Sequence, residues 1–328
     1  MKIVVVVDVG AWAVKVLVAA DGRIIKKFQF PSAVGLETNG ALSTFRSGNE
    51  EIIEVRPKID GTTYRVSLRQ NQQVADHSRP TPGDDFQISR AHDALLAAAL
   101  HAAEVPHIDV LVIGTPVHTY LKHAENLKKW SGTVDFGLGK RILVVKTLVL
   151  PQPYGSLLAG KNERVIEREE HINHIILDVG HYSTDVLTTK GGLAVNDDRS
   201  FGIGFGTAVV YQKIADMIAS DLRLPVTDLD RIEYSIRSRS QYIAHSRHFD
   251  LNGEYLQRVQ AHIEVIVSDL YGRIKTTEDI SSVLLTGGGS GIFERAVRKI
   301  FRSTRVCIIS DPIHANARGY LIAGHSSL

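Results

Sequence analysis

Two short stretches decide the fold of this chain: Val4-Val5-Val6-Val7-Asp8-Val9-Gly10 near its start and Ile175-Ile176-Leu177-Asp178-Val179-Gly180 in its middle. Each is an apolar run rich in β-branched residues that ends in Asp-Val-Gly, which is typical of a buried strand followed by a tight turn. A second strand is predicted after each turn, at residues 13–19 and 183–189. The chain therefore has an internal duplication, which predicts two α/β sheets of the same construction, one in each half.

The Asp-x-Gly turns have chemistry that suits phosphate. Glycine has no Cβ, so backbone N–H groups can close around phosphate oxygens, and the aspartate can hold Mg²⁺ through water. Either turn alone is compatible with a plain hairpin, whereas two turns facing each other across a cleft favour nucleotide binding. The candidate nucleotide-binding residues of the two turns are Asp8, Gly10, Lys15, Asp178, Gly180, Ser183 and Asp185, with Asp8 and Asp178 as the candidate Mg²⁺ ligands.

A glycine triplet, Gly287-Gly288-Gly289, follows a predicted strand at residues 283–286 and precedes a predicted helix at residues 292–301. Glycines there allow a ligand to approach the backbone, and a helix N-terminus favours negative charge. A strand-to-helix turn can also need glycine for packing alone. The position of the triplet beyond the second Asp-x-Gly turn favours the ligand-binding interpretation.

The bulk composition excludes several classes of protein. The net charge of +2 and the lack of long Lys/Arg runs give no reason to expect direct nucleic-acid binding. The single cysteine, Cys307, excludes an internal disulfide and fits a reducing compartment. The apolar run at residues 3–7 is far shorter than a membrane helix. We therefore expect a cytoplasmic protein without a membrane partner.

These motifs together resemble the phosphate-1, phosphate-2 and adenosine motifs of the superfamily of actin, sugar kinases and heat-shock chaperones. The matching segments are Asp8-x-Gly10-x4-Lys15, Asp178-x-Gly180-x2-Ser183-x-Asp185 and Thr286-Gly287-Gly288-Gly289. The segments Pro151-Gln152-Pro153-x-Gly155 and Asn316-Ala317-x-Gly319-Tyr320 resemble the helices that link the two halves in this superfamily. Within it, the chain looks most like the plasmid-segregation actins of the ParM/StbA type and their archaeal relatives.

The resemblance implies an actin-like, ribonuclease H-like fold, in which two duplicated α/β domains flank a nucleotide cleft. Length and pattern then place domain I at residues 1–160, with a polar inserted subdomain at about 30–89, and domain II at 161–311, with an insertion at about 208–272. The C-terminal helix, residues 312–328, is expected to return to domain I.

The resemblance also implies ATP or ADP and Mg²⁺ as ligands, and an ATPase that polymerises into filaments. Such proteins move plasmid DNA through an adaptor protein bound to a centromere-like site. The implied catalytic residues are Asp8, Asp178 and Gln152, which occupies the position that orients the attacking water. Without the family context, Gln152 is equally well interpreted as a structural residue at a helix start.

The sequence departs from the family pattern at Ala11-Trp12 and at His181-Tyr182, which are bulkier than usual. Two alternatives therefore stay open. A small-molecule kinase would need a carboxylate base near the γ-phosphate, where this chain has Gln152. A nucleotide-binding assembly scaffold with little hydrolysis would fit the bulky residues beside the turns.

Overall fold

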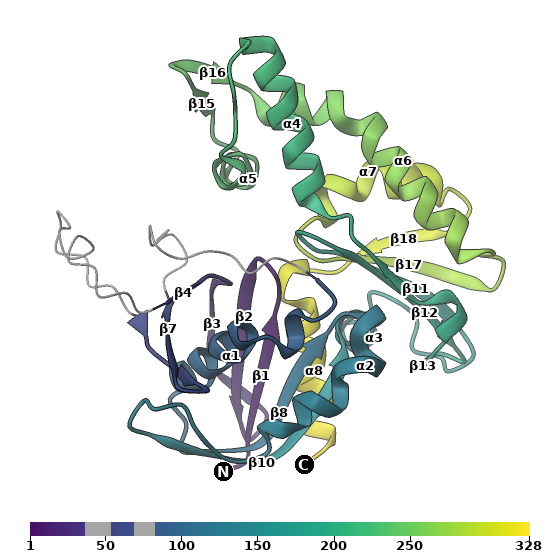
Figure 1. Cartoon of the computed structure of the whole chain (residues 1–328). Coiled ribbons are helices and arrows are strands. Elements are labelled where there is room, and N and C mark those ends of the chain that lie inside the picture. The colour runs from purple at the N-terminus through teal and green to yellow at the C-terminus, as the bar shows by residue number, and fades with distance from the viewer. Residues whose placement is uncertain (37–53, 69–82) are drawn as a thin grey trace. The chain divides into compact units, whose positions relative to one another are not determined.

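The computed structural model describes residues 1–36, 54–68 and 83–328, and the chain divides into two compact units (Figure 1). Unit 1 comprises residues 1–160 and 314–328, and unit 2 comprises residues 161–313. Parts of the predicted insertion at 30–89, namely residues 37–53 and 69–82, lie outside the described residues. Each unit has a mixed sheet with helices packed on it, which confirms the predicted duplicated α/β fold.

The sheet of unit 1 has the strand order β3-β2-β1-β8-β10-β9. β1 pairs antiparallel with β2 and parallel with β8, and β8 pairs parallel with β10. The strands are β1 (Ile3–Val9), β2 (Ala13–Ala20), β3 (Arg23–Pro31), β8 (His107–Thr115), β9 (Gly132–Asp135) and β10 (Arg141–Pro151). A smaller sheet is formed by β4 (Val34–Leu36), β5 (Glu54–Val55), β6 (Lys58–Ile59) and β7 (Thr62–Ser67).

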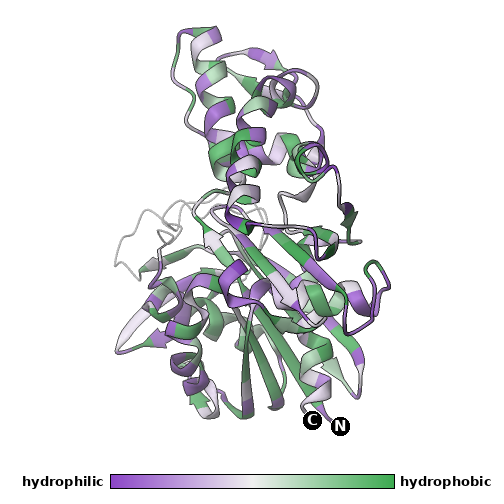
Figure 2. Ribbon diagram, turned by 90° about the vertical axis from the view of Figure 1, so that its right-hand side faces the viewer, coloured by the Kyte–Doolittle hydropathy of each residue, from purple (hydrophilic) through white to green (hydrophobic). Residues whose placement is uncertain are grey.

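Helices cover both faces of β1, which explains its continuous apolar run from Ile3 to Val7. Val5 and Val7 face the core formed with α1 (Arg90–Ala103) and α2 (Val117–Leu127). Val4 and Val6 face α8 (Ala315–Ser326) on the other side of the sheet. Figure 1 shows α8 beside β1 and β8, and Figure 2 shows hydrophobic colour along the strands of the sheets. Ser89 precedes a run rich in Ala and Leu, which predicts a helix over residues 90–103 with Ser89 as its cap. This cap is confirmed, because the Ser89 side chain accepts a hydrogen bond from the backbone N–H of His92.

The sheet of unit 2 repeats this construction in the order β13-β12-β11-β17-β18, with β14 also paired to β12. Its strands are β11 (Asn173–Val179), β12 (Thr184–Lys190), β13 (Ala194–Val195), β14 (Phe201–Ile203), β17 (Ile280–Thr286) and β18 (Arg305–Ile308). The helices α4 (Thr207–Leu222), α5 (Leu229–Ser238), α6 (Leu256–Ile274) and α7 (Ser290–Ile300) accompany it, with the hairpin β15 (Tyr242–Ala244) and β16 (Arg247–Phe249).

Short helical turns complete the described structure. They are η2 (Phe86–Ile88), η3 (Lys128–Trp130), η4 (Asp197–Arg199), η5 (Leu251–Tyr255) and η6 (Pro312–His314). Among the residues that the structure describes, no helix combines the length and the apolar character needed to cross a membrane.

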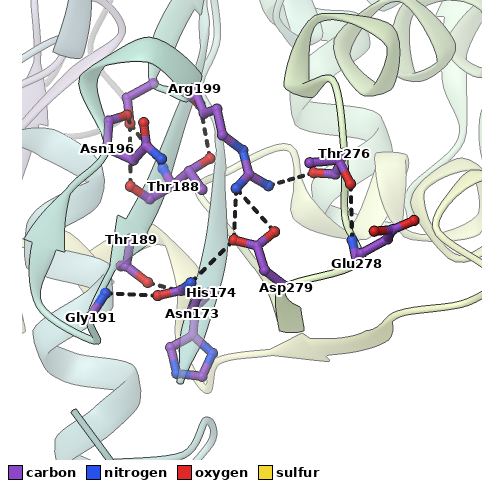
Figure 3. Close-up of polar contacts among 11 residues, drawn as sticks. Asn173, His174, Thr188, Thr189, Gly191, Asn196, Arg199, Thr276, Glu278 and Asp279 are labelled. Carbon is purple, nitrogen blue, oxygen red and sulfur yellow. Dashed lines mark hydrogen bonds and ion pairs between the residues drawn. The ribbon is translucent and has the colours of Figure 1, made fainter. Parts of the chain in front are cut away.

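A polar network fastens the end of the unit 2 sheet that lies away from its Asp-x-Gly turn (Figure 3). Nη1 of Arg199 donates to both carboxylate oxygens of Asp279, at 3.0 and 2.8 Å. Nδ2 of Asn173, the first residue of β11, donates to the same carboxylate at 3.2 Å. The loop before β17 is thereby tied to the start of β11 and to η4.

One predicted boundary was wrong. The sequence after Pro151-Gln152-Pro153-x-Gly155 predicts a helix that begins at Ser156. The helix is α3 (Gln152–Asn162), which begins four residues earlier, directly after Pro151. Pro153 is tolerated there because first-turn N–H groups have no partner within a helix. Gln152 is therefore at the very start of a helix that follows directly on β10.

Candidate functional site

The first Asp-x-Gly turn closes between β1 and β2. The backbone N–H of Gly10 donates to the carbonyl of Ala13 at 3.2 Å. A Cβ on Gly10 would lie 3.1 Å from that oxygen, so the turn fits glycine closely. On the other side of the turn, Ser32 donates through its hydroxyl to the carbonyl of Gly10 and through its N–H to that of Trp12.

The Asp8 carboxylate, 1% exposed, is the polar centre of this turn. Asp8 lies opposite Lys15 in the β1–β2 register, and Nζ of Lys15 is 3.0 Å from Oδ2 of Asp8. Nε2 of Gln152 donates to Oδ1 of Asp8 at 2.9 Å. Three of the residues predicted from sequence are therefore in direct contact, although Gln152 lies far from Asp8 in the chain.

The orientation of the Gln152 amide follows from this contact. A carboxylate accepts hydrogen bonds and does not donate them, so the NH₂ group must face Asp8. The amide oxygen Oε1 then points away from that bond and can accept a hydrogen from water. This geometry allows Gln152 to orient a water molecule, while an amide is too weak a base to deprotonate one.

Helix α3 is held in place by α8 of the same unit. Oγ of the buried Ser156 donates to Oδ1 of Asn316 at 2.6 Å. A Cβ on Gly319 would lie 2.7 Å from Cα of Gly155, and a Cβ on Gly155 would lie 2.8 Å from Cα of Asn316. The two helices therefore cross backbone against backbone, and this crossing fixes the helix that carries Gln152.

The second Asp-x-Gly turn, between β11 and β12, closes in the same way as the first. The N–H of Gly180 donates to the carbonyl of Ser183 at 2.8 Å, and a Cβ on Gly180 would lie 3.0 Å from that oxygen. Asp178 and Asp185 are both buried and are paired across the two strands. Position 185 corresponds to Lys15 in the first turn, so the second turn has two carboxylates where the first has a carboxylate and an ammonium group.

The three glycines of the triplet have different surroundings. Gly287 has φ +83°, and a Cβ there would overlap Oδ1 of Asp178 and the carbonyl of Val179. Gly289 donates its N–H to the carbonyl of Val179 at 2.9 Å, and a Cβ there would lie 2.6 Å from Cγ2 of Thr207. Gly288 is exposed, with no atom within 4 Å of an added Cβ. Two glycines therefore pack against the second turn, and Gly288 leaves its backbone open to a ligand.

Sequence reasoning missed several residues that support these turns. Ser32 and Ser156 have no sequence pattern that marks them, because their partners lie across the fold. The helical pattern of residues 207–223 predicts α4 but not the role of its first turn. There the N–H groups of Thr207 and Ala208 donate to the carbonyls of Gly180 and His181, at 3.1 and 2.8 Å.

The carboxylates of the two turns can be compared with the ligands that a metal ion needs. Within residues 1–36, 54–68 and 83–328, no group of three or more His, Cys, Asp or Glu side chains is arranged to hold one. Mg²⁺ does not require such a group, since it keeps several waters and binds through one or two carboxylates together with substrate phosphates. The buried carboxylates of Asp8 and Asp178 fit that pattern within their own turns.

Comparisons with known proteins agree with this fold. Residues 7–155 match the family of actin-like proteins, N-terminal domain, and residues 176–299 match the archaeal actin homologues, MreB-like, C-terminal domain. No curated protein matched the sequence. Each half of the chain therefore matches one domain of the actin-like families.

Solved structures of ParM and of an archaeal actin homologue share the fold. The archaeal actin homologue Ta0583 in complex with ADP aligns with TM-score 0.77 and 21% identity over 99% of this chain and 100% of its own. A 15-stranded ParM filament from Clostridium botulinum aligns with TM-score 0.73 and 19% identity over 99% of both chains. The apo pSK41 ParM protein gives TM-score 0.70 and 19% identity over 99% and 98%.

Proposed function

We propose that the protein is an actin-like ATPase that binds ATP or ADP with Mg²⁺, polymerises with ATP and hydrolyses it in the filament. The observation that carries the proposal is the matched construction of the two Asp-x-Gly turns. Each is closed by the same glycine hydrogen bond, and each has a buried aspartate at the end of a central strand. Such turns present N–H groups and carboxylates suited to phosphate and its metal.

The residues have separate roles in this proposal. Gly10, Gly180 and Ser183 shape the phosphate-binding turns, and Gly288 offers open backbone for the nucleoside. Asp8 and Asp178 would hold Mg²⁺ through water, and the metal would neutralise charge that develops on the phosphates. Lys15 and Gln152 keep the Asp8 carboxylate in a single orientation.

The amide side chain of Gln152 determines how fast the proposed hydrolysis can be. With its NH₂ group bound to Asp8, its amide oxygen orients the attacking water for in-line displacement at the γ-phosphate. The proton must leave by another route, because the amide does not become a base. We therefore expect slow turnover of ATP. Slow hydrolysis suits a protein in which ATP controls filament assembly.

The biological part of the proposal is the segregation of plasmid DNA through an adaptor protein, in the cytoplasm. It is supported by the ParM structures among the structural relatives. The balanced net charge of +2 supports an adaptor rather than direct DNA contact. A gel-shift assay with plasmid DNA and purified protein alone should show no specific complex.

The test is sedimentation of the purified protein, run beside phosphate release. With ATP and Mg²⁺, polymers should pellet above a critical concentration, whereas ADP should favour monomers. Phosphate release should not depend on added sugars. A protein that stays monomeric with ATP at concentrations well above micromolar overturns the filament proposal. A monomeric protein whose turnover depends on an added sugar would indicate a kinase. In a separate outcome, polymers that form without phosphate release would indicate a scaffold.

A further inference from the structure

The second Asp-x-Gly turn is attached to helix α4 through its backbone. The first N–H groups of a helix have no partner within the helix, and in α4 two of them bind the carbonyls of Gly180 and His181. Gly206 precedes them, and a Cβ there would lie 2.6 Å from the carbonyl oxygen of Gly180. The turn and the helix start are therefore in backbone contact, and neither can shift alone.

The side chain of His181 makes a second attachment, to helix α5. Its side chain is 7% exposed, and Nδ1 lies 3.4 Å from Oγ1 of Thr207 and 3.6 Å from Oε2 of Glu233. The ring packs edge-on against Tyr182 at 4.5 Å and tilted against Tyr211 at 5.9 Å between centroids. The His181 side chain is thus buried among the turn, α4 and α5.

Glu233 is an unusual residue for its position. Its side chain is 8% exposed in the middle of α5, between the buried Ile232 and Ile236. A buried carboxylate is costly unless it is paired. Nη1 of Arg237 lies 3.3 Å from Oε1, while Oε2 faces His181. Burial, together with the nearby negative charge of Glu233, raises the pKa of Tyr211.

We propose that Glu233 is a positioning residue for nucleotide binding, which acts through the imidazole of His181 on the backbone of Gly180 and His181. The inference rests on the proposed function. The Glu233 carboxylate attracts the Nδ1 edge of the ring, and the ring holds the peptide that shapes the phosphate-binding turn. Because coupling between sites is reciprocal, nucleotide in the turn also changes the position of α5 in the inserted part of unit 2.

The proposal explains why His181 replaces a small residue beside the turn. A small side chain would leave the turn attached through α4 alone. The imidazole adds a direct link to α5, and that link exists only while both His181 and Glu233 are present.

The test is a double-mutant cycle on ATP affinity in the presence of Mg²⁺. Glu233→Gln keeps the shape of the side chain and removes its charge, and His181→Ala removes the ring. Each should weaken ATP binding about 10-fold, within the usual range of coupling between sites. The double variant should be no weaker than either single variant, because both remove one link. His181→Asn, which retains an N–H group near the Nδ1 position, should recover most of the lost affinity.

Tyr234→Ala is the matched control, because Tyr234 is the next residue on α5 and is 62% exposed. Its ATP affinity should stay within about twofold of the wild type. Single variants that bind as tightly as the wild type overturn the proposal, even if they melt earlier. A double variant about 100-fold weaker also overturns it, since Glu233 would then act independently of His181.

Hydrogen exchange without nucleotide separates this inference from the proposed function. In Glu233→Gln, the amides of residues 180–183 and 207–208 should exchange faster, whereas those of α7 should not change. A wild-type protein that binds no ATP refutes the proposed function, but the exchange data still decide whether Glu233 positions the turn. Unchanged exchange at residues 180–183 refutes the link.

Discussion

Gly287→Ala is the sharpest test of the site in unit 2, because the neighbouring glycine supplies its control. Gly287 has φ +83°, and alanine in this left-handed region costs about 1–2 kcal/mol. The added Cβ would also lie 2.8 Å from the carbonyl carbon of Val179, and nearer still to Oδ1 of Asp178. Since ordinary contacts begin at 3.4 Å, the second Asp-x-Gly turn must shift, and overpacking of this kind costs about 1–3 kcal/mol.

Together these effects predict a loss of roughly 2–5 kcal/mol. For a unit of this size, each kcal/mol lowers the melting temperature by about 2–4 °C, so a decrease of roughly 4–20 °C is expected. ATP affinity should also fall at a temperature where the variant is folded, because the displaced atom belongs to the Asp178 carboxylate.

Gly288→Ala makes the same chemical change one residue away. Gly288 is exposed and has no atom within 4 Å of an added Cβ. Its free energy of unfolding should change by no more than about 0.5 kcal/mol, as is usual for surface substitutions, and its melting temperature should change little. Calorimetry of the two variants decides the matter: equal melting temperatures would refute the packing role of Gly287. Weaker ATP binding by Gly288→Ala at an unchanged melting temperature would place the ligand against this backbone.

Three further predictions concern charge and hydrogen bonding. Asp178→Ala should abolish Mg²⁺-dependent phosphate release in a protein that remains folded by circular dichroism; normal turnover would rule out the metal role. Gln152→Ala should slow phosphate release roughly 10- to 1000-fold with ATP affinity near wild type; an equal loss of affinity would mean that Gln152 is structural. The hydrogen bond from Arg199 lowers the pKa of Asp279 below its usual 3.8, so the pair stabilises the fold above that pH and its contribution is lost as the pH falls through the lowered pKa. Asp279→Asn should cost about 1 kcal/mol at pH 7, a modest value because the carboxylate is 44% exposed and screened. The urea midpoints of variant and wild type should converge as the pH falls through the lowered pKa of Asp279; a constant difference would contradict the ion-pair account.

The duplicated sheets could be predicted from sequence because their decisive features are local. The runs that end at Asp8 and Asp178 combine β-branched residues with a turn glycine, and β1 and β11 formed there. The short helix α5 was not predicted, since Leu229–Ser238 lies in a segment that is rich in charged and polar residues. It buries Ile232 and Ile236 only because α4 and η5 are packed beside it. Tertiary contact, rather than propensity, determines such a helix.

The roles of individual glycines could not be obtained from sequence, for a related physical reason. Sequence reasoning gave Gly287, Gly288 and Gly289 one role in ligand binding, but what an added Cβ would meet depends on strands and helices far away in the chain. Gly287 and Gly289 are needed for packing, because an added Cβ would meet Val179 at both positions and Thr207 at Gly289. Gly155 illustrates the same point. By sequence it belongs to a segment that resembles a helix linking the two halves, whereas the structure places it at the crossing of α3 with α8. A side chain there would push the two helices apart and displace Gln152 from Asp8, so weaker assembly of such a variant would report the loss of this crossing.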